Sequence, residues 1–413
     1  MRLTPVLALL VSLLMNPVAH ARNDYVSPKG SDHHRGTLRA PWRTLAYAVR
    51  QARPGDHLWL EGGNYTGGVV IDRPGTAHHW ITLSAYHGQK VVVVDAHGHK
   101  DDLYFYCNGF KPLYWRVEGL DLVGGDDYVV KIDVPDGQLI GNDMHSSHDD
   151  IVKLVRTAAN VVIERNRIHD NDAKDGANAQ GVDIVGASNV RVAYNRVYNI
   201  PSFGMFAKGN ASHVVFAHNV LDHIYSRGIM LGQATGIQFM IPGRTYETYD
   251  SVIRDNVIEH TGGACVATAS SWRPRIYDNY CRDVATRNTA GIFVSNESEL
   301  HQAGTDVYIH NNVIILGGSR PAVEIAPNAM TSDRTLHIDH NLYWSPKGAR
   351  GVRFSWVRGL GEGKFSFYFV SFSTWQRLTG FDRDSMVSPP TLAMERRILG
   401  GAVGLPSSGA SLH

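Results

Sequence analysis

The sequence predicts an all-β, right-handed parallel β-helix, in which the chain winds into stacked coils of short strands. One short pattern recurs: an apolar strand, a small polar corner, and an asparagine that opens the next strand. These corner asparagines lie 23 to 37 residues apart, a spacing typical of a solenoid whose repeat is one coil. Each repeat alternates apolar and polar residues and is rich in Val and Ile, which excludes a helical solenoid. The series is Asn142, Asn166, Asn195, Asn219, Asn256, Asn279, Asn312 and Asn341.

We interpret the recurring asparagines as structural rather than catalytic. Asparagine tolerates the left-handed conformation that a tight corner requires, and stacked amides can hydrogen-bond from coil to coil. With coils ~4.8 Å apart, eight of them predict a rod at least ~34 Å long.

The bulk composition fits one large elongated domain. The chain has 413 residues, of which 43% are apolar, so it can bury an extensive core. With 40 basic and 39 acidic residues the net charge is +1, which gives no global field to attract a polyanion. We therefore expect no nucleic-acid partner, and any recognition of charge must be local.

The first 21 residues have the features of a secretory signal. A basic residue, Arg2, precedes an apolar stretch from Val6 to Met15, and Ala19-His20-Ala21 has the small-x-small form of a cleavage site. We expect cleavage near Ala21 and a secreted or periplasmic product. No later stretch is long and apolar enough to span a bilayer.

The remaining chain divides into a β-helix over residues 22–360 and a C-terminal capping segment with a tail over residues 361–413. A short helix from Ala46 to Ala52 is expected to cap the N-terminal end, since an open terminal coil would expose its strand edges and core. The segment past residue 365 is irregular and is expected to form a second cap. Capped ends argue against end-to-end stacking, so we expect a monomer.

Three cysteines, Cys107, Cys265 and Cys281, allow one disulfide at most. Cys265 falls on an inward strand position. We therefore predict that it is a small core residue rather than a bridge partner.

A set of motifs near the N-terminus resembles a known family. The motifs are Tyr25-Val26-Ser27-Pro28-Lys29-Gly30-Ser31-Asp32, Gly36-Thr37, Pro41-Trp42-Arg43-Thr44, Pro54-Gly55-Asp56, Gly63-Asn64-Tyr65 and Gly75-Thr76 followed by Ile81-Thr82. Together they are similar to the N-terminal segment of secreted β-helix polysaccharide lyases that act on pectate, alginate and chondroitin. The resemblance covers about residues 25–100, with weaker coil-level similarity to about residue 360. It implies a lysine base on the β-helix, assisted in the alginate and chondroitin group by an arginine one coil later.

One outward face of the coils concentrates charged side chains. Aligning the strands after each corner places Lys153, Asp183 and Lys208 on three adjacent coils of one sheet, within about 10 Å. Arg227 comes just before the next strand and Gln233 just after it. The column of Lys153 is predicted to contain Lys153, Asp183, Phe206, Met230, Val266, Phe293 and Glu324.

Phe206 and Met230 on this face could form an apolar floor for a sugar ring. The alternative is that Lys153 and Asp183 form only a cross-strand ion pair on a solvated sheet, which would contribute little.

This face suits β-elimination from a uronic-acid polymer. That reaction removes the proton at C5, next to a carboxylate, so it needs a base together with positive charge near the carboxylate. Lys208 can be the base if cationic neighbours lower its pKa, and Arg227 can neutralise the carboxylate. His223, on the turn before Arg227, is a further candidate for acid–base work.

Loop residues add candidates for binding the substrate and a metal ion. One insertion, from Ile237 to Asp250, contains Arg244 and Tyr246, and a second runs from Asn296 to Thr305. Loops on one side of a solenoid usually build its binding face. Asp149 and Asp150 could bind Ca²⁺ through their carboxylates, although adjacent aspartates on a corner are more often solvated.

These observations favour a polysaccharide lyase acting on an acidic polysaccharide, and three alternatives stay open. A glycoside hydrolase needs two carboxylates across the scissile bond, and Glu324 lies about five coils from Asp183. A C5-epimerase would use similar lysine, arginine and histidine chemistry. A non-catalytic β-helix that binds or guides an exported polysaccharide would need no catalytic set.

Overall fold

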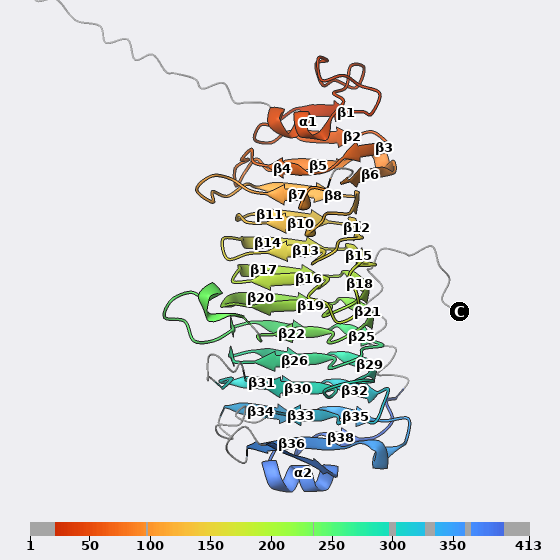
Figure 1. Cartoon of the computed structure of the whole chain (residues 1–413), viewed down its shortest axis with the longest axis vertical. Coiled ribbons are helices and arrows are strands. Elements are labelled where there is room, and N and C mark those ends of the chain that lie inside the picture. Colours follow the sequence, from red (N-terminus) through yellow and green to blue (C-terminus); the bar gives the residue numbers. More distant parts are fainter. Residues whose placement is uncertain are drawn as a thin grey trace, which may run out of the picture.

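In the computed structural model, this chain winds into a single stack of coils (Figure 1). The structure describes residues 21–95, 98–233, 235–296, 303–326, 335–359 and 365–391. Residues 1–20, which contain nearly all of the expected secretory signal, lie outside this part of the chain. So do the centre of the Asn296–Thr305 insertion and the Gly/Ser-rich tail.

Three long sheets run along the stack, and each full coil contributes one strand to each sheet, so the predicted parallel β-helix is confirmed. Within the described residues the sheets have 12, 14 and 12 strands, and every pairing is parallel except that of β36 with β37. Sheet 1 comprises β4 (Val69–Ile71), β7 (Asp101–Phe105), β10 (Tyr128–Ile132), β13 (Val152–Leu154), β16 (Val182–Val185), β19 (Met205–Lys208), β22 (Ile229–Leu231), β26 (Val266–Ala269), β30 (Ile292–Ser295), β33 (Val323–Ile325), β36 (Phe354–Gly359) and β37 (Phe365–Val370). Sheet 2 comprises β1 (Asn23–Val26), β2 (His57–Leu60), β5 (Ile81–Ala85), β8 (Trp115–Glu118), β11 (Gly137–Ile140), β14 (Ala159–Glu164), β17 (Ser188–Ala193), β20 (Ala211–Ala217), β23 (Thr248–Tyr249), β24 (Val252–Arg254), β27 (Ser271–Trp272), β28 (Arg275–Tyr277), β31 (Val307–His310) and β34 (Leu336–Asp339). Sheet 3 comprises β3 (Gly63–Thr66), β6 (Val91–Val94), β9 (Asp121–Val123), β12 (Asp143–His145), β15 (Arg167–His169), β18 (Arg196–Ile200), β21 (Val220–Ile224), β25 (Val257–Glu259), β29 (Tyr280–Val284), β32 (Val313–Leu316), β35 (Leu342–Trp344) and β38 (Met386–Val387).

The two α-helices of the described residues lie at opposite ends of the stack (Figure 1). Helix α1 spans Leu45–Gln51, one residue earlier than predicted, because the Thr44 side chain caps it by accepting a hydrogen bond from the Tyr47 amide. Helix α2 spans Phe372–Thr379, and its Trp375 is fully buried against Phe354 of β36. The described part of the chain also contains the short 3₁₀ turns η1 (Tyr86–Gly88), η2 (Ile237–Phe239) and η3 (Ala349–Gly351).

The corner asparagines form a continuous buried ladder, which confirms their structural role. Asn195, for example, donates from its backbone amide and from Nδ2 to Oδ1 of Asn219, at 2.9 and 3.0 Å. The same pair of bonds links every neighbouring pair from Asn142 to Asn341. The ladder therefore fixes the register of sheets 2 and 3 coil by coil.

We predicted that the asparagine of each corner takes the left-handed conformation. Instead, the residue before it does. Tyr194 and His218, which precede Asn195 and Asn219, have φ values of 58° and 57°. The reason is that the asparagine amide must point into the coil to join the ladder, so the preceding residue makes the turn.

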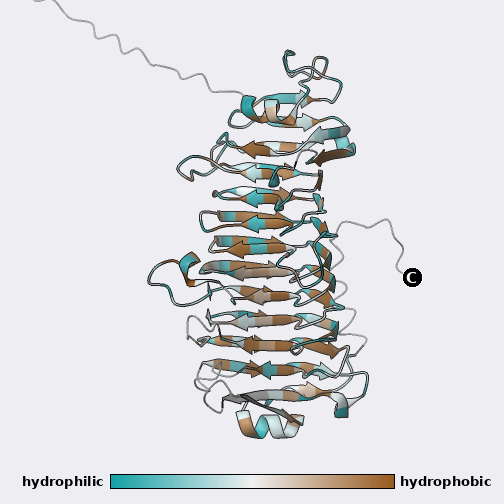
Figure 2. Ribbon diagram, viewed as in Figure 1, coloured by the Kyte–Doolittle hydropathy of each residue, from teal (hydrophilic) through white to brown (hydrophobic). Residues whose placement is uncertain are grey.

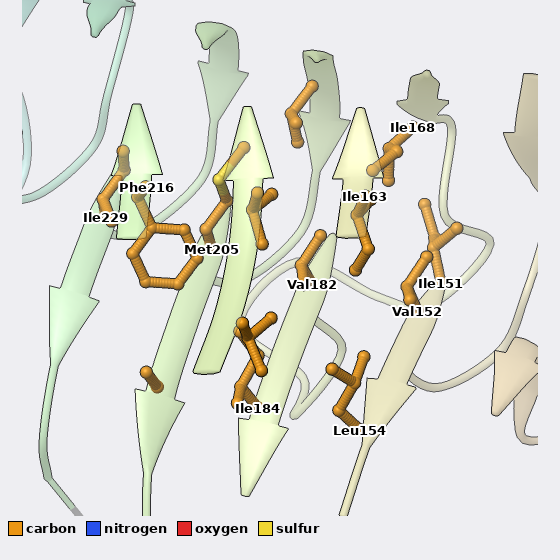
Figure 3. Packing of buried hydrophobic residues seen from close by; sticks show 14 of the residues in the cluster. Ile151, Val152, Leu154, Ile163, Ile168, Val182, Ile184, Met205, Phe216 and Ile229 are labelled. Carbon is orange, nitrogen blue, oxygen red and sulfur yellow. The ribbon is translucent and has the colours of Figure 1, made fainter. Parts of the chain in front are cut away.

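Apolar side chains fill the interior of the stack along its whole length, and Figure 2 shows apolar residues recurring along the strands of successive coils. In one section Val182, Ile184, Met205, Phe216 and Ile229 pack together from neighbouring coils (Figure 3). Such close packing makes each coil depend on its neighbours.

The prediction for Cys265 is wrong: Cys265 and Cys281 form a disulfide, with their Cα atoms 6.0 Å apart. Cys265 is buried, as expected, but Cys281 of β29 faces the same interior from the next coil. Sequence position alone did not reveal that the two lie opposite each other. Cys107 is a free thiol. No helix among the described residues is long and apolar enough to cross a membrane.

Candidate functional site

The outward face of sheet 1 brings together most of the charged residues predicted for the site. Strand register aligns Lys153 with Asp183 and Asp183 with Phe206, while Lys208, two residues beyond Phe206, points to the same side. The predicted position of Val266 in this column is wrong, because Val266 packs into the core and Ala267 faces outward. The observed column is Lys131, Lys153, Asp183, Phe206, Met230, Ala267, Phe293 and Glu324.

Four side chains form an ionic cluster at the centre of this face. The Lys153 ammonium bonds Oδ2 of Asp150 at 2.8 Å and also bonds Oδ2 of Asp183. Lys208 Nζ lies 3.7 Å from the same Asp183 oxygen. Both carboxylates are fully buried, whereas the two lysine side chains are 14% and 13% exposed. Because the carboxylates are dry, this cluster is more than the solvated ion pair that was the alternative.

The two lysines are almost equally exposed but differ in how firmly they are held. Burial alone would lower the pKa of Lys153, but Asp183 and Asp150 together raise it above its ordinary value. Burial raises the pKa of the Asp150 carboxyl to about 8, with Asp183 adding to the rise and Lys153 opposing it. Lys153 is therefore locked in its protonated form, whereas Lys208 has one longer contact.

The carboxylates proposed for calcium do not fit that ion as they are arranged. Oδ2 of Asp150 accepts from Lys153, and Oδ1 accepts from the Gln180 amide at 2.8 Å. Asp149 has one oxygen, Oδ1, that is buried without a hydrogen-bond partner. Calcium takes six to eight oxygen ligands, and here a fixed ammonium already lies on the best-placed carboxylate.

Arg227 lies under the surface in the turn before β22, the strand that pairs with β19 of Lys208. Its Nη1 donates to Oε1 of Gln233 and lies 3.1 Å from Sδ of Met230. The guanidinium also stacks over Phe293, at 4.8 Å from the ring centroid, and over Phe203 at 5.2 Å. Burial lowers the pKa of Arg227 to about 10, so the group stays cationic at neutral pH.

Phe206 and Met230 do not form an open floor for a sugar, which corrects the prediction. Their side chains are 2% and 0% exposed, and they pack into a small outer apolar cluster with Phe293. Lys208 Nζ lies 4.5 Å above the Phe206 ring. The apolar pair thus supports the cations from below instead of facing solvent.

The insertion that contains Arg244 and Tyr246 is anchored by a residue that sequence reasoning missed. Glu247 is fully buried and accepts hydrogen bonds from the Gly209 amide and the Thr235 hydroxyl, both at 2.7 Å. Tyr246 is nearly buried against Trp272, whereas Arg244 is exposed over Tyr249. Among the described residues, the ion pairs of the ionic cluster do not include Arg244.

His223 belongs to a second group, on sheet 3. It shares the Asp222 carboxylate with His260: their Nδ1 atoms lie 2.9 and 2.7 Å from Oδ1. The rings stack with centroids 4.8 Å apart, beside a hollow of about 510 Å³ that Tyr225 and Arg287 also line. The ligand atoms of this trio lie within 4.8 Å of one another, a spacing that could hold a transition metal.

Sequence reasoning overlooked His260, although a signal for it exists. His223 and His260 each lie four residues after a ladder asparagine, Asn219 and Asn256. Residues at equal offsets from the ladder stack on successive coils, so counting from the asparagines predicts this pair. No contact among the described residues joins His223 to Lys208 or Arg227.

Comparisons with known proteins agree with the fold and with the predicted right-handed winding. A family model described as "Pel9A-like, right handed beta helix region" matches residues 24–251. Over 79 residues the chain is 40% identical to the pectate lyase PEL9 of Emericella nidulans, a match that covers 19% of each protein.

Two solved structures resemble this one at low sequence identity. The pectate lyase Pel9A superposes with a TM-score of 0.50 at 14% identity, covering 72% of this chain and 79% of that one. A mannuronic-acid-specific family 6 polysaccharide lyase from human gut microbiota gives 0.57 at 13% identity, covering 92% and 95%. At these identities the likeness shows the shared fold alone.

Proposed function

Because the chain belongs to the Pel9A-like right-handed β-helix family, we propose that it is a polysaccharide lyase that cleaves a uronic-acid polymer by β-elimination. The observation that carries the proposal is the unequal pairing of two lysines on sheet 1. Lys153 is bound by two buried carboxylates, while Lys208 keeps a single contact of 3.7 Å. A general base must be able to lose its proton, so the loosely held lysine is the better candidate.

In the proposed reaction neutral Lys208 takes the proton from C5 of a uronate. The electrons of the C5–H bond form a double bond between C4 and C5, the bond from C4 to the glycosidic oxygen breaks, and that oxygen takes a proton from solvent. Charge that builds on the substrate carboxylate needs a nearby cation, and Arg227 is cationic at neutral pH. Gln233, which accepts from Arg227, holds the guanidinium in place.

The hydrolase alternative is less well supported by the arrangement of the acids. A glycoside hydrolase needs two carboxylates that reach the bond from either side. Asp150 and Asp183 both bind the ammonium of Lys153, but both are fully buried. Glu324 lies in the same column as Asp183, five strand pairings away.

The proposed setting follows from the substrate class. Acidic polysaccharides lie outside the cytoplasm, so we place the mature protein in the periplasm or outside the cell, consistent with the apolar stretch near the N-terminus. The substrate is the expected partner, and the protein is expected to act as a monomer.

The decisive experiment follows absorbance in the near ultraviolet, where only elimination creates an unsaturated sugar end. The purified protein is incubated with alginate, polygalacturonate, chondroitin sulfate, hyaluronan and heparan sulfate, beside Lys208→Ala and the control Lys131→Ala. Lys131 lies in the same column but outside the Asp150–Asp183 cluster, 4.0 Å from Asp133. A rise on one polymer that Lys208→Ala abolishes and Lys131→Ala retains supports the proposal. New reducing ends without absorbance would favour hydrolysis, an altered uronate without cleavage would favour epimerisation, and an unchanged polymer would favour a binding role.

A further inference from the structure

The arrangement around Lys153 has the form of a cation site whose cation is part of the chain. The lysine is on β13, and its ammonium lies between carboxylates from two successive coils. Asp150 is three residues before it, and Asp183 is its direct neighbour on β16. Both acids are fully buried, so neither carboxyl group is hydrated.

The cluster has no excess of negative charge that an added ion would have to offset. Asp150 and Asp183 supply at most two negative charges, and Lys153 and Lys208 supply two positive charges when both are protonated. Removing the Lys153 ammonium would leave Asp150 without its ionic partner, which is destabilising for a buried acid. The balance also means that an incoming divalent ion would meet an ammonium at its own position and be repelled.

The Lys153 ammonium bonds one oxygen of each acid, and its 2.8 Å contact with Asp150 Oδ2 is that of a charge-assisted hydrogen bond. The second oxygen of Asp150 is engaged by the Gln180 amide, so it is not free as a further ligand.

We propose that Lys153 is a built-in counter-ion that takes the place of a divalent cation at Asp150 and Asp183, so that the folded site is independent of calcium. The inference concerns the same site as the proposed function, but it can be tested without any cleavage assay. It also predicts that removing the ammonium turns the two aspartates into a site that calcium can enter.

Thermal unfolding tests this, with about 5 mM CaCl₂ or EDTA present, a concentration above the dissociation constants of ordinary extracellular calcium sites. The Tm of the wild-type protein and of the control Lys131→Ala should be the same in both. Lys153→Ala should unfold roughly 5 to 10 °C lower in EDTA and recover by about 2 to 4 °C in calcium. The triple variant Lys153→Ala/Asp150→Asn/Asp183→Asn should lose that recovery.

The proposal does not depend on Lys153→Ala being folded. If that variant cannot be purified, terbium luminescence and calcium titration calorimetry on the wild-type protein decide the matter: no saturable binding is expected. Calcium that raises the Tm of the wild-type protein, and no longer does so in Asp150→Asn, would overturn the proposal. A folded Lys153→Ala variant with the same Tm in calcium and in EDTA would also overturn the proposal.

Discussion

Lys208 lies 3.7 Å from the Asp183 oxygen that the Lys153 ammonium also binds, so one buried carboxylate serves two lysines on neighbouring coils. Asp183 therefore sets the electrostatic environment of the proposed base. Replacing it with asparagine keeps the shape but removes the negative charge that both lysines contact.

We expect Asp183→Asn to lower kcat on the polymer that the absorbance assay identifies, because Lys208 then loses the ionic contact that holds its Nζ in place. The variant should also lose about 3 kcal/mol or more of unfolding free energy, because Lys153 then keeps only one ionic partner. Steady-state kinetics and urea denaturation measure the two effects. An unchanged kcat in a folded variant would show that Asp183 does not position the proposed base.

The asparagine ladder predicts a large cost for one small substitution. Asn219 accepts from the backbone amide and Nδ2 of Asn195 and donates to the Val192 carbonyl, all in the buried interior. Asn219→Ala leaves several of these groups unsatisfied, which should cost about 3 kcal/mol. Chemical denaturation measures it, with the exposed Asn64→Ala on β3 as the control. Equal stabilities for the two variants would contradict the claim that the buried hydrogen bonds of the ladder stabilise the fold.

The ladder also marks what the sequence could reveal. Its spacing predicted the coils, and the aligned strands predicted the meeting of Lys153, Asp183 and Lys208, because both follow from counting along a repeat. The burial of Phe206 and Met230 could not be predicted from the repeat, because it depends on how the turn containing Arg227 packs over sheet 1. The Cys265–Cys281 bond was missed for a related reason: it joins different sheets across the interior.

Asp101 on β7 predicts a pH dependence of stability. Burial raises the pKa of its carboxyl to about 6, above an unfolded value of about 3.9, and one of its oxygens is buried without a hydrogen-bond partner. Between these two values the folded state holds a proton that the unfolded state has lost. Stability from this group is therefore present below pH ~4 and is lost as pH rises to about 6.

Asp101→Asn should remove that loss and gain about 1 to 2 kcal/mol at pH 7, after allowance for partial solvent screening. Urea denaturation at about pH 4, 5, 6 and 7 would measure how the free energy of unfolding changes with pH across this range. Asp127→Asn is the comparison variant. A wild-type stability that rises through this window, with no difference in slope between wild type and Asp101→Asn, would refute the assignment.

Arg227 offers a test of whether shape or charge matters beside the ionic cluster. Its planar group reaches Gln233 and lies over the Phe293 ring, 4.8 Å from the centroid. A lysine ammonium keeps the charge but cannot make both contacts, because it is a point charge on a flexible stem. If Arg227 neutralises the substrate carboxylate from a fixed position, Arg227→Lys should reduce kcat by about 10- to 100-fold and change KM less.

Gln233→Ala should show a smaller loss of kcat in the same direction, since the guanidinium remains but loses one of its hydrogen bonds. Steady-state kinetics on the polymer that the absorbance assay identifies would measure both, with unfolding curves to confirm that each variant is folded. Full activity in Arg227→Lys would show that the Arg227 guanidinium is not needed for the proposed reaction. Its role would then be structural, through its contacts with Met230 and Phe293.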